Sequence, residues 1–172
     1  MASLADVFKV VIDLKSEGII NQYAVGGAMA VLFYAEPART YALDVFVDLP
    51  PPASGITILT PIYDRLKALG GKADMEHIIV YGVPVQFLPS HTELVDEAIN
   101  SAVVHNYEGV PVRVVRPEHL IALAFQAGGA RRRERVGLLM EAGAVDSATL
   151  RAIMERHDLM KFWREDFEGG DA

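Results

Sequence analysis

The chain has 172 residues, of which 51% are hydrophobic and 23% are charged, a balance typical of a globular domain rather than of a disordered segment. With 16 Lys and Arg residues against 23 Asp and Glu residues, the formal net charge of -7 excludes a general attraction to nucleic acid, and a polyanion would need a local basic patch. The absence of Cys excludes disulfides and thiolate metal sites. The sequence has no signal-peptide pattern and no run near the roughly 20 apolar residues that cross a bilayer, so we expect a soluble, cytoplasmic protein without membrane contact.

The predicted elements form a mixed α/β part followed by a helical part. Hydrophobic spacing defines each segment, and Gly and Pro mark the boundaries. In chain order we predict a helix over 4–17, a strand over 19–25, a helix over 27–34, a strand over 40–49, a short strand over 56–59, a helix over 61–69, a hairpin over 77–81 and 83–88, a helix over 92–98, a hairpin over 102–106 and 110–115, and helices over 118–126, 131–141 and 147–156.

The order of these elements predicts the fold class. Two hairpins indicate a mixed or antiparallel sheet rather than a doubly wound parallel one, so we predict an α+β fold with a mixed sheet flanked by helices. We divide the chain into an α/β core over 1–116 and a C-terminal helical section over 117–172 that packs on the core. The two parts are expected to form one structural unit.

A Gly-Gly pair separates the first predicted strand from the next helix. Gly26 and Gly27 would place bare backbone N–H groups at the positive end of a helix, where a phosphate can dock. The same pair also suits a tight strand-to-helix turn that holds no ligand. Both interpretations stay open on the residues alone.

The strand that follows carries acidic side chains on one face. Because side chains alternate along a strand, Asp44 and Asp48 share a face with Ala42 and Phe46. Asp44 is either a metal ligand or a strand residue that pairs with a basic neighbour such as Arg39.

Together these residues resemble the start of a nucleotidyltransferase of the polymerase-beta-like superfamily, in its minimal or AbiEii toxin-like branch. Gly26-Gly27, the helix, Arg39-Thr40 and the acidic strand carry the resemblance, which extends more loosely over 22–139. It implies a nucleotidyltransferase-like mixed sheet whose Gly-Gly turn holds nucleotide phosphates. In such proteins two acids at i and i+2, with a third on a neighbouring strand, bind two divalent metals.

The resemblance assigns roles residue by residue. Gly26, Gly27, Arg39 and Thr40 would bind the nucleotide phosphates, and Asp44 would be both the catalytic residue and the metal ligand. An active protein would use Mg²⁺ and an NTP to transfer a nucleotidyl group to a hydroxyl of RNA, protein or a small molecule. The branch also implies a toxin and antitoxin setting.

The chain departs from this pattern at its chemical positions. Ala42 stands where the first acid belongs, and Gln86 in VPVQFLP stands where the third belongs. Lys positions of the family's later helices read Ala124-Phe125 and Arg131-Arg132 here. We therefore favour a catalytically degenerate protein that acts as a nucleotide- or protein-binding module, with the active Mg-dependent enzyme as the alternative.

An arginine run supplies the basic patch that the overall charge lacks. Arg131 and Arg132 are assigned as phosphate contacts, and the run from Arg131 to Arg135 could contact RNA, since guanidinium forks match phosphate oxygens. The alternative is a solvated helix face balanced by Glu134 through near-neighbour pairing.

Two further groups of residues carry weaker signals. The five histidines show no metal-binding spacing, and we interpret them as surface or strand residues. Phe162, Trp163 and Phe167 form an aromatic cluster that either closes the helical section or offers a patch to a protein partner or a second subunit of a homodimer.

Overall fold

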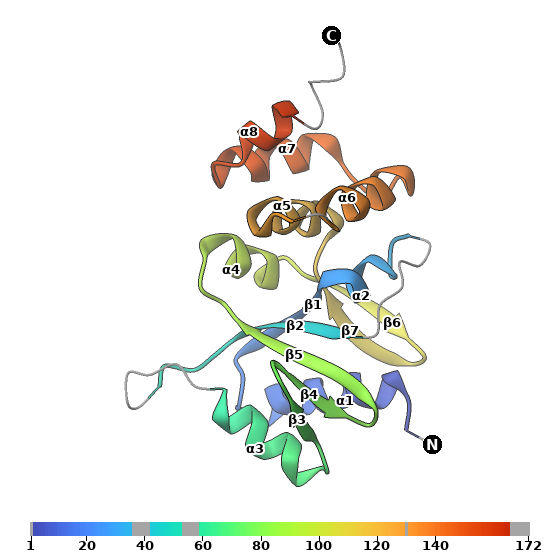
Figure 1. Ribbon diagram of the computed structural model, residues 1–172, viewed down its shortest axis with the longest axis vertical. Helices are drawn as coiled ribbons and strands as arrows, with labels where there is room; N and C mark the ends of the chain where they lie inside the picture. The colour runs from blue at the N-terminus through green and yellow to red at the C-terminus, as the bar shows by residue number, and fades with distance from the viewer. Residues whose placement is uncertain (1, 36–41, 53–58, 130, 166–172) are drawn as a thin grey trace.

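The computed structural model describes residues 2–35, 42–52, 59–129 and 131–165, and shows a sheet between two groups of helices (Figure 1). Its elements in chain order are α1 (Leu4–Ser16), β1 (Gln22–Gly26), α2 (Gly27–Val31), β2 (Leu43–Asp48), α3 (Thr60–Ala68), β3 (Lys72–Asp74), β4 (His77–Val80), β5 (Val83–Pro89), α4 (Glu93–Asn100), β6 (Val103–Tyr107), β7 (Val110–Val114), α5 (Pro117–Ala127), α6 (Arg131–Glu141), α7 (Ser147–Arg156) and α8 (Met160–Trp163).

The described strands form one mixed sheet of seven strands, in the order β3-β4-β5-β2-β1-β7-β6. β2 runs antiparallel to β1 and parallel to β5, and β1 runs parallel to β7. The antiparallel pairs β4-β5 and β6-β7 lie on either side of this centre, and β3 extends one edge. The prediction of an α+β fold with a mixed sheet flanked by helices is confirmed.

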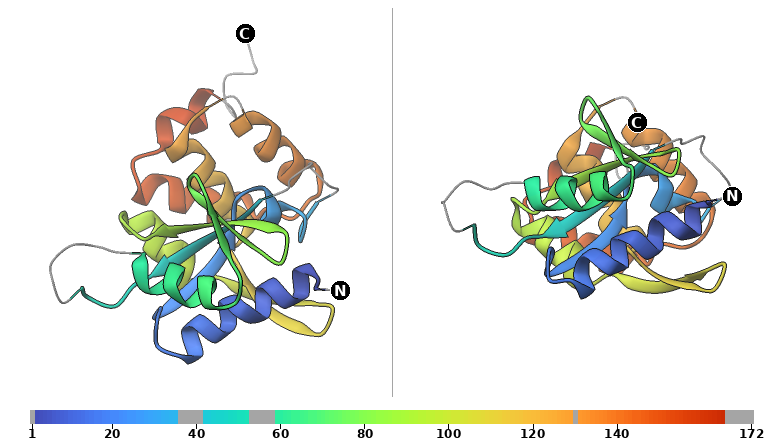
Figure 2. Two further views of the ribbon diagram at one scale, coloured as in Figure 1. Left: turned by 60° about the horizontal axis from the view of Figure 1, so that its bottom comes forward. Right: turned by 90° about the horizontal axis from the view of Figure 1, so that it is seen from below.

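Helices cover both faces of the sheet. α1 and α3 pack on one face and lie in front of the sheet when the molecule is seen from below (Figure 2, right). α2 and α4 pack on the other face, and α5 to α8 stack beyond them (Figure 1). Along β2, Leu43, Val45 and Val47 are buried, whereas Asp44 and Phe46 are partly exposed on the face that α2 covers.

Most predicted elements are confirmed, with shifted ends. The helix predicted over 27–34 ends at Val31, because the next residues form tighter turns in which each N–H bonds to the carbonyl three residues earlier. Neither the exposed strand β3 nor the one-turn helix α8 was expected from hydrophobic spacing, since both are very short. Residues 56–58 of the strand predicted over 56–59 lie outside the described residues. No helix among the described residues is long and apolar enough to cross a membrane.

One cluster of buried apolar side chains connects the sheet to the C-terminal helices. Val25 and Val45 of the central strands belong to it, together with Ile121, Leu139 and Leu150 of α5, α6 and α7. α5 also contacts both α2 and α4. The boundary between a core over 1–116 and a helical section over 117–172 stays a prediction.

A polar cluster around Glu97 of α4, formed with His119, Arg156 and His157, joins α4 to the C-terminal helices. The Nε2 atoms of His119 and His157 lie 3.0 and 2.7 Å from the two carboxylate oxygens of Glu97, and the Arg156 guanidinium donates to the same carboxylate. Burial raises the pKa of Glu97, but hydrogen bonds from Arg156, His157 and His119 outweigh burial and lower the pKa to about 2. The interpretation of the histidines as surface or strand residues is wrong for His119, which is 4% exposed in α5.

We expect Glu97→Gln to lower the free energy of unfolding at pH 7 by about 1–3 kcal/mol, because three donors lose their charged acceptor. The pKa of Glu97 is lower in the folded than in the unfolded protein. Its contribution to the free energy of unfolding is therefore complete above pH 4.5, the ordinary pKa, and is lost as the pH falls toward about 2. Urea titrations should therefore show wild type and variant converging below pH 4.5.

The matched control is Glu155→Gln, which removes an exposed carboxylate paired with Arg151 on α7. This exposed pair should contribute less than about 0.5 kcal/mol. Equal effects of the two variants would contradict a stabilising role for the Glu97 cluster.

Candidate functional site

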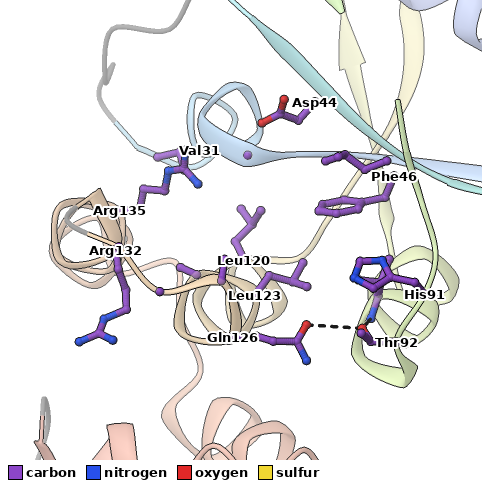
Figure 3. Close-up of a pocket in the computed structure, with 17 residues that line it drawn as sticks. Val31, Asp44, Phe46, His91, Thr92, Leu120, Leu123, Gln126, Arg132 and Arg135 are labelled. Atoms are coloured by element: carbon purple, nitrogen blue, oxygen red, sulfur yellow. Dashed lines mark hydrogen bonds between the residues drawn. The ribbon is translucent and has the colours of Figure 1, made fainter. Parts of the chain in front are cut away.

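A cleft of about 700 Å³ lies between the sheet and the helices α2, α5 and α6 (Figure 3). We call it the Asp44 cleft. Asp44 and Phe46 of β2 form its sheet side, and Leu120 and Leu123 of α5 face them. The cleft's volume lies in the range of small-molecule sites, and its lining is largely apolar with a few polar side chains.

The Gly-Gly pair allows β2 to approach α2 closely. A Cβ atom on Gly26 would lie 2.3 Å from the Phe46 ring, and one on Gly27 would lie 2.1 Å from Oδ2 of Asp44. Gly27 also has a backbone φ of +59°, which residues other than Gly rarely adopt. Packing therefore favours Gly at both positions, because a Cβ there would displace the Phe46 or the Asp44 side chain, whether or not the turn binds the phosphates that the sequence predicts.

The strand register brings the positions singled out in the sequence side by side. Gly26 lies opposite Asp44 across β1 and β2, and Asp44 lies opposite Gln86 across β2 and β5. Ala42 directly precedes β2. Asp48 lies at the other end of β2, four residues or about 13 Å from Asp44.

The residues around Asp44 do not fit two divalent metals. Asp44 has the neutral amide of Gln86 beside it, and Ala42 has no ligand atom in its side chain. Within the described ranges, no three His, Cys, Asp or Glu side chains converge in a way that could hold a metal ion. Bridging carboxylates are what hold a two-metal pair, and among the described residues that line the cleft Asp44 is the one carboxylate.

Asp44 is a half-buried carboxylate whose charge is disfavoured by its surroundings. Burial raises its pKa above the ordinary value, and attraction from Arg135 and then from His77 opposes that rise. Arg135 lies on α6 and lines the same cleft. The sequence points to Arg135 only within the run that could contact RNA and not among the phosphate contacts, although its spacing of three from Arg132 places the two on adjoining parts of one helix surface.

The arginine run divides into residues with different surroundings. The Arg132 guanidinium carbon lies 5.2 Å from the ring centres of both Phe125 and Phe162, which stack on each other. In Figure 3 this guanidinium points away from Asp44, whereas the Arg135 side chain extends toward Val31 of α2.

The other predicted residues fall in three groups. Arg133 is exposed to solvent, and Arg131 is the first residue of α6. Arg39 and Thr40 lie outside the described residues, as does Phe167. Phe162 and Trp163 pack against the hydrophobic core and remain partly exposed, so both interpretations of this part of the aromatic cluster stay predictions.

Polar groups at the opposite end of the cleft were not expected from the sequence. Thr92 is the N-cap of α4, and its Oγ1 hydroxyl donates a hydrogen bond of 3.4 Å to Oε1 of Gln126 on α5. His91 lies beside them (Figure 3). These residues converge only because α5 packs over the start of α4, which no local pattern records.

Comparison with solved structures identifies this architecture. The crystal structure of ANT(2'')-Ia in complex with adenylyl-2''-tobramycin is 13% identical and superposes with a TM-score of 0.56 over 94% of this chain and 99% of that chain. An antigenic nucleotidyltransferase-like protein from Paracoccidioides brasiliensis is 16% identical, with a TM-score of 0.58 over 95% of this chain and 88% of that chain. The chain has the nucleotidyltransferase fold. A solution structure of the antibiotic-resistance factor ANT(2'')-Ia gives a TM-score of 0.52 at 13% identity, over 94% of this chain and 96% of that chain.

Neither the protein-family models nor the curated proteins gave a match to the sequence. The nucleotidyltransferase fold therefore places the Asp44 cleft in a known architecture, while the activity has to be argued from the cleft's own residues.

We expect Gly27→Ala to lower the free energy of unfolding by about 2–4 kcal/mol, because strain in the left-handed region and overpacking each cost about 1–3 kcal/mol. Gly82→Ala is the matched control: its φ is +80°, but a Cβ there meets nothing within 4 Å. Chemical denaturation should show the Gly27 variant clearly less stable than the control. If the two variants lose equal stability, the contact with Asp44 is unimportant.

We expect Asp44→Asn to raise the midpoint of thermal unfolding at pH 7, because it removes a carboxylate whose pKa burial raises. A raised carboxyl pKa means that the ionised group costs stability above its folded pKa, and that this cost disappears as the pH falls below the ordinary value of 3.8. The gain should therefore vanish near pH 3, and Asp13→Asn on the exposed side of α1 is the control for replacing a carboxylate with an amide. A loss of stability at pH 7 would mean that Arg135 compensates the charge fully.

Proposed function

We propose that this protein is a catalytically degenerate member of the nucleotidyltransferase fold that binds a nucleotide in the Asp44 cleft. One observation carries the proposal: Asp44 of β2 lies opposite Gln86 of β5, and Ala42 is two residues before Asp44, directly before β2 begins. In the pattern that the sequence resembles, these three positions hold the metal-binding acids. Two of the three have lost their carboxylates.

The losses affect chemistry more than binding. Nucleotidyl transfer by two metals depends on carboxylates that hold the cations against the attacking and leaving oxygens. An amide and a methyl group cannot neutralise two such cations. The cleft between β2, α2 and α5 nevertheless keeps a volume suited to a ligand of nucleotide size.

The structural similarity supports a nucleotide rather than an unrelated ligand. The crystal structure of ANT(2'')-Ia holds adenylyl-2''-tobramycin, in which a nucleotidyl group is joined to an antibiotic. We carry over to this chain the nucleotide part alone. The AbiEii-like branch and the toxin and antitoxin setting belong to the same proposal and rest on the Gly26-Gly27 and Arg39-Thr40 motif.

The test is a thermal-shift and calorimetric titration with ATP, GTP, CTP and UTP, with and without Mg²⁺ or Mn²⁺, together with an assay for pyrophosphate release. At least one nucleotide should stabilise the protein, by about 2.7 kcal/mol at a concentration 100 times its Kd. We expect no metal-dependent turnover. Turnover in wild type that is lost in Asp44→Ala would establish the active enzyme instead, and stabilisation by no nucleotide would leave a protein-binding role.

A gain-of-function variant sharpens this test. Ala42→Asp combined with Gln86→Asp restores three carboxylates near Gly26, and should make nucleotide binding respond to Mg²⁺. Gln22→Asp is the control. Gln22 pairs with Asp48 at the other end of β2, so this substitution adds a carboxylate away from the cleft. An Mg²⁺ response in the control but not in the double variant would contradict the assignment of these positions.

A further inference from the structure

The charges that line the Asp44 cleft are those expected for an anion rather than for a metal ion. Of the described residues that line it, the charged ones are Asp44, Arg132 and Arg135, and the formal charges of these three sum to +1. A site that collects divalent cations needs the opposite sign. A guanidinium group directed into the cleft can bind a phosphate without a metal.

The two arginines do not face the cleft in the same way. Arg132 holds its guanidinium over the rings of Phe125 and Phe162, on the side of the C-terminal helices. Arg135 reaches toward α2 and acts on Asp44 electrostatically (Figure 3). The cation directed at the chemical end of the cleft is therefore Arg135.

The turn at Gly27 is poorly suited to hold the phosphate without such a cation. α2 has five residues, so its helix dipole is small. The Asp44 carboxylate also occupies the space beside the Gly27 Cα, where it would repel a phosphate. A phosphate in this cleft consequently needs a cation on the α6 side.

The other end of the cleft offers an aromatic ring and neutral polar groups. Phe46 forms the wall there, with Leu123 across from it, and Thr92 and Gln126 present a hydroxyl and an amide (Figure 3). A nucleobase stacks on aromatic rings and forms hydrogen bonds with amides and hydroxyls at its edge. The cleft thus combines a cationic end with an end that suits a base.

We propose that the Asp44 cleft binds a nucleoside phosphate without a divalent cation, with the phosphate on the Arg135 guanidinium and the base against Phe46. This inference rests on the proposed function. It replaces the metal dependence of the resembled family with a fixed cation on α6.

The test is isothermal titration calorimetry in EDTA with the four nucleoside 5′-monophosphates, the matching nucleosides and ribose 5-phosphate. At least one monophosphate should bind wild type in EDTA, and Arg135→Gln should weaken that binding about tenfold or more, since a charge-assisted contact is lost. Arg133→Gln, an exposed position on the same helix, is the matched control and should bind as wild type does. Arg135→Lys keeps the positive charge and should bind more tightly than Arg135→Gln.

Each ligand and variant has an outcome that would contradict the inference, and a nucleoside that binds as tightly as its monophosphate would remove the phosphate from the contact with Arg135. Binding that requires Mg²⁺ or Mn²⁺ would overturn the metal-free site and leave the proposed nucleotide-binding function intact. If no monophosphate or triphosphate binds, either in EDTA or with Mg²⁺ or Mn²⁺, both the metal-free site and the proposed function are overturned. Equal affinities of Arg135→Gln and Arg133→Gln would remove Arg135 from the site. Ribose 5-phosphate that binds as tightly as the monophosphate would remove the base from the contact with Phe46.

Discussion

The close approach of β2 to the Gly-Gly turn is the constraint on which the cleft depends. Asp44 and Phe46 fill the space that side chains on Gly27 and Gly26 would need. This contact sets how near α2 lies to the sheet, and α2 in turn contacts α5 and α6, which form the opposite side of the cleft. The same packing leaves a half-buried carboxylate beside an apolar surface, where a charge is costly unless a group of opposite sign compensates it.

A guanidinium in the cleft has different abilities from a pair of metal ions. It is present at every metal concentration, it matches the geometry of phosphate oxygens, and it is held by the helix that carries it. It cannot generate a metal-bound nucleophile or bridge the attacking and leaving oxygens as two cations do. Under the proposed function, a cleft with Arg135 on one side and the Asp44 carboxylate on the other recognises a nucleotide without transferring it.

The sequence predicts the parts of this protein that follow from local patterns. Alternation along β2 places Asp44 and Phe46 on one face, and the resemblance to a nucleotidyltransferase implies that Gln86 lies on a strand beside the strand of Asp44, which the register confirms. The surroundings of Arg132 and Arg135 could not be predicted, because they depend on how α6 packs against α2 and α8. Glu97 and His157 are 60 residues apart, and no periodicity links a helix to a residue so distant along the chain.

One of the two edge strands of the sheet, β3, limits how that edge can pair with other copies of the protein. β3 has three residues, all exposed, and two of them are Lys72 and Asp74. A further strand from another molecule would find few backbone groups to pair with and would have to desolvate two charged side chains. This edge is therefore protected against the strand addition that leads to aggregates, at no expense to the apolar core.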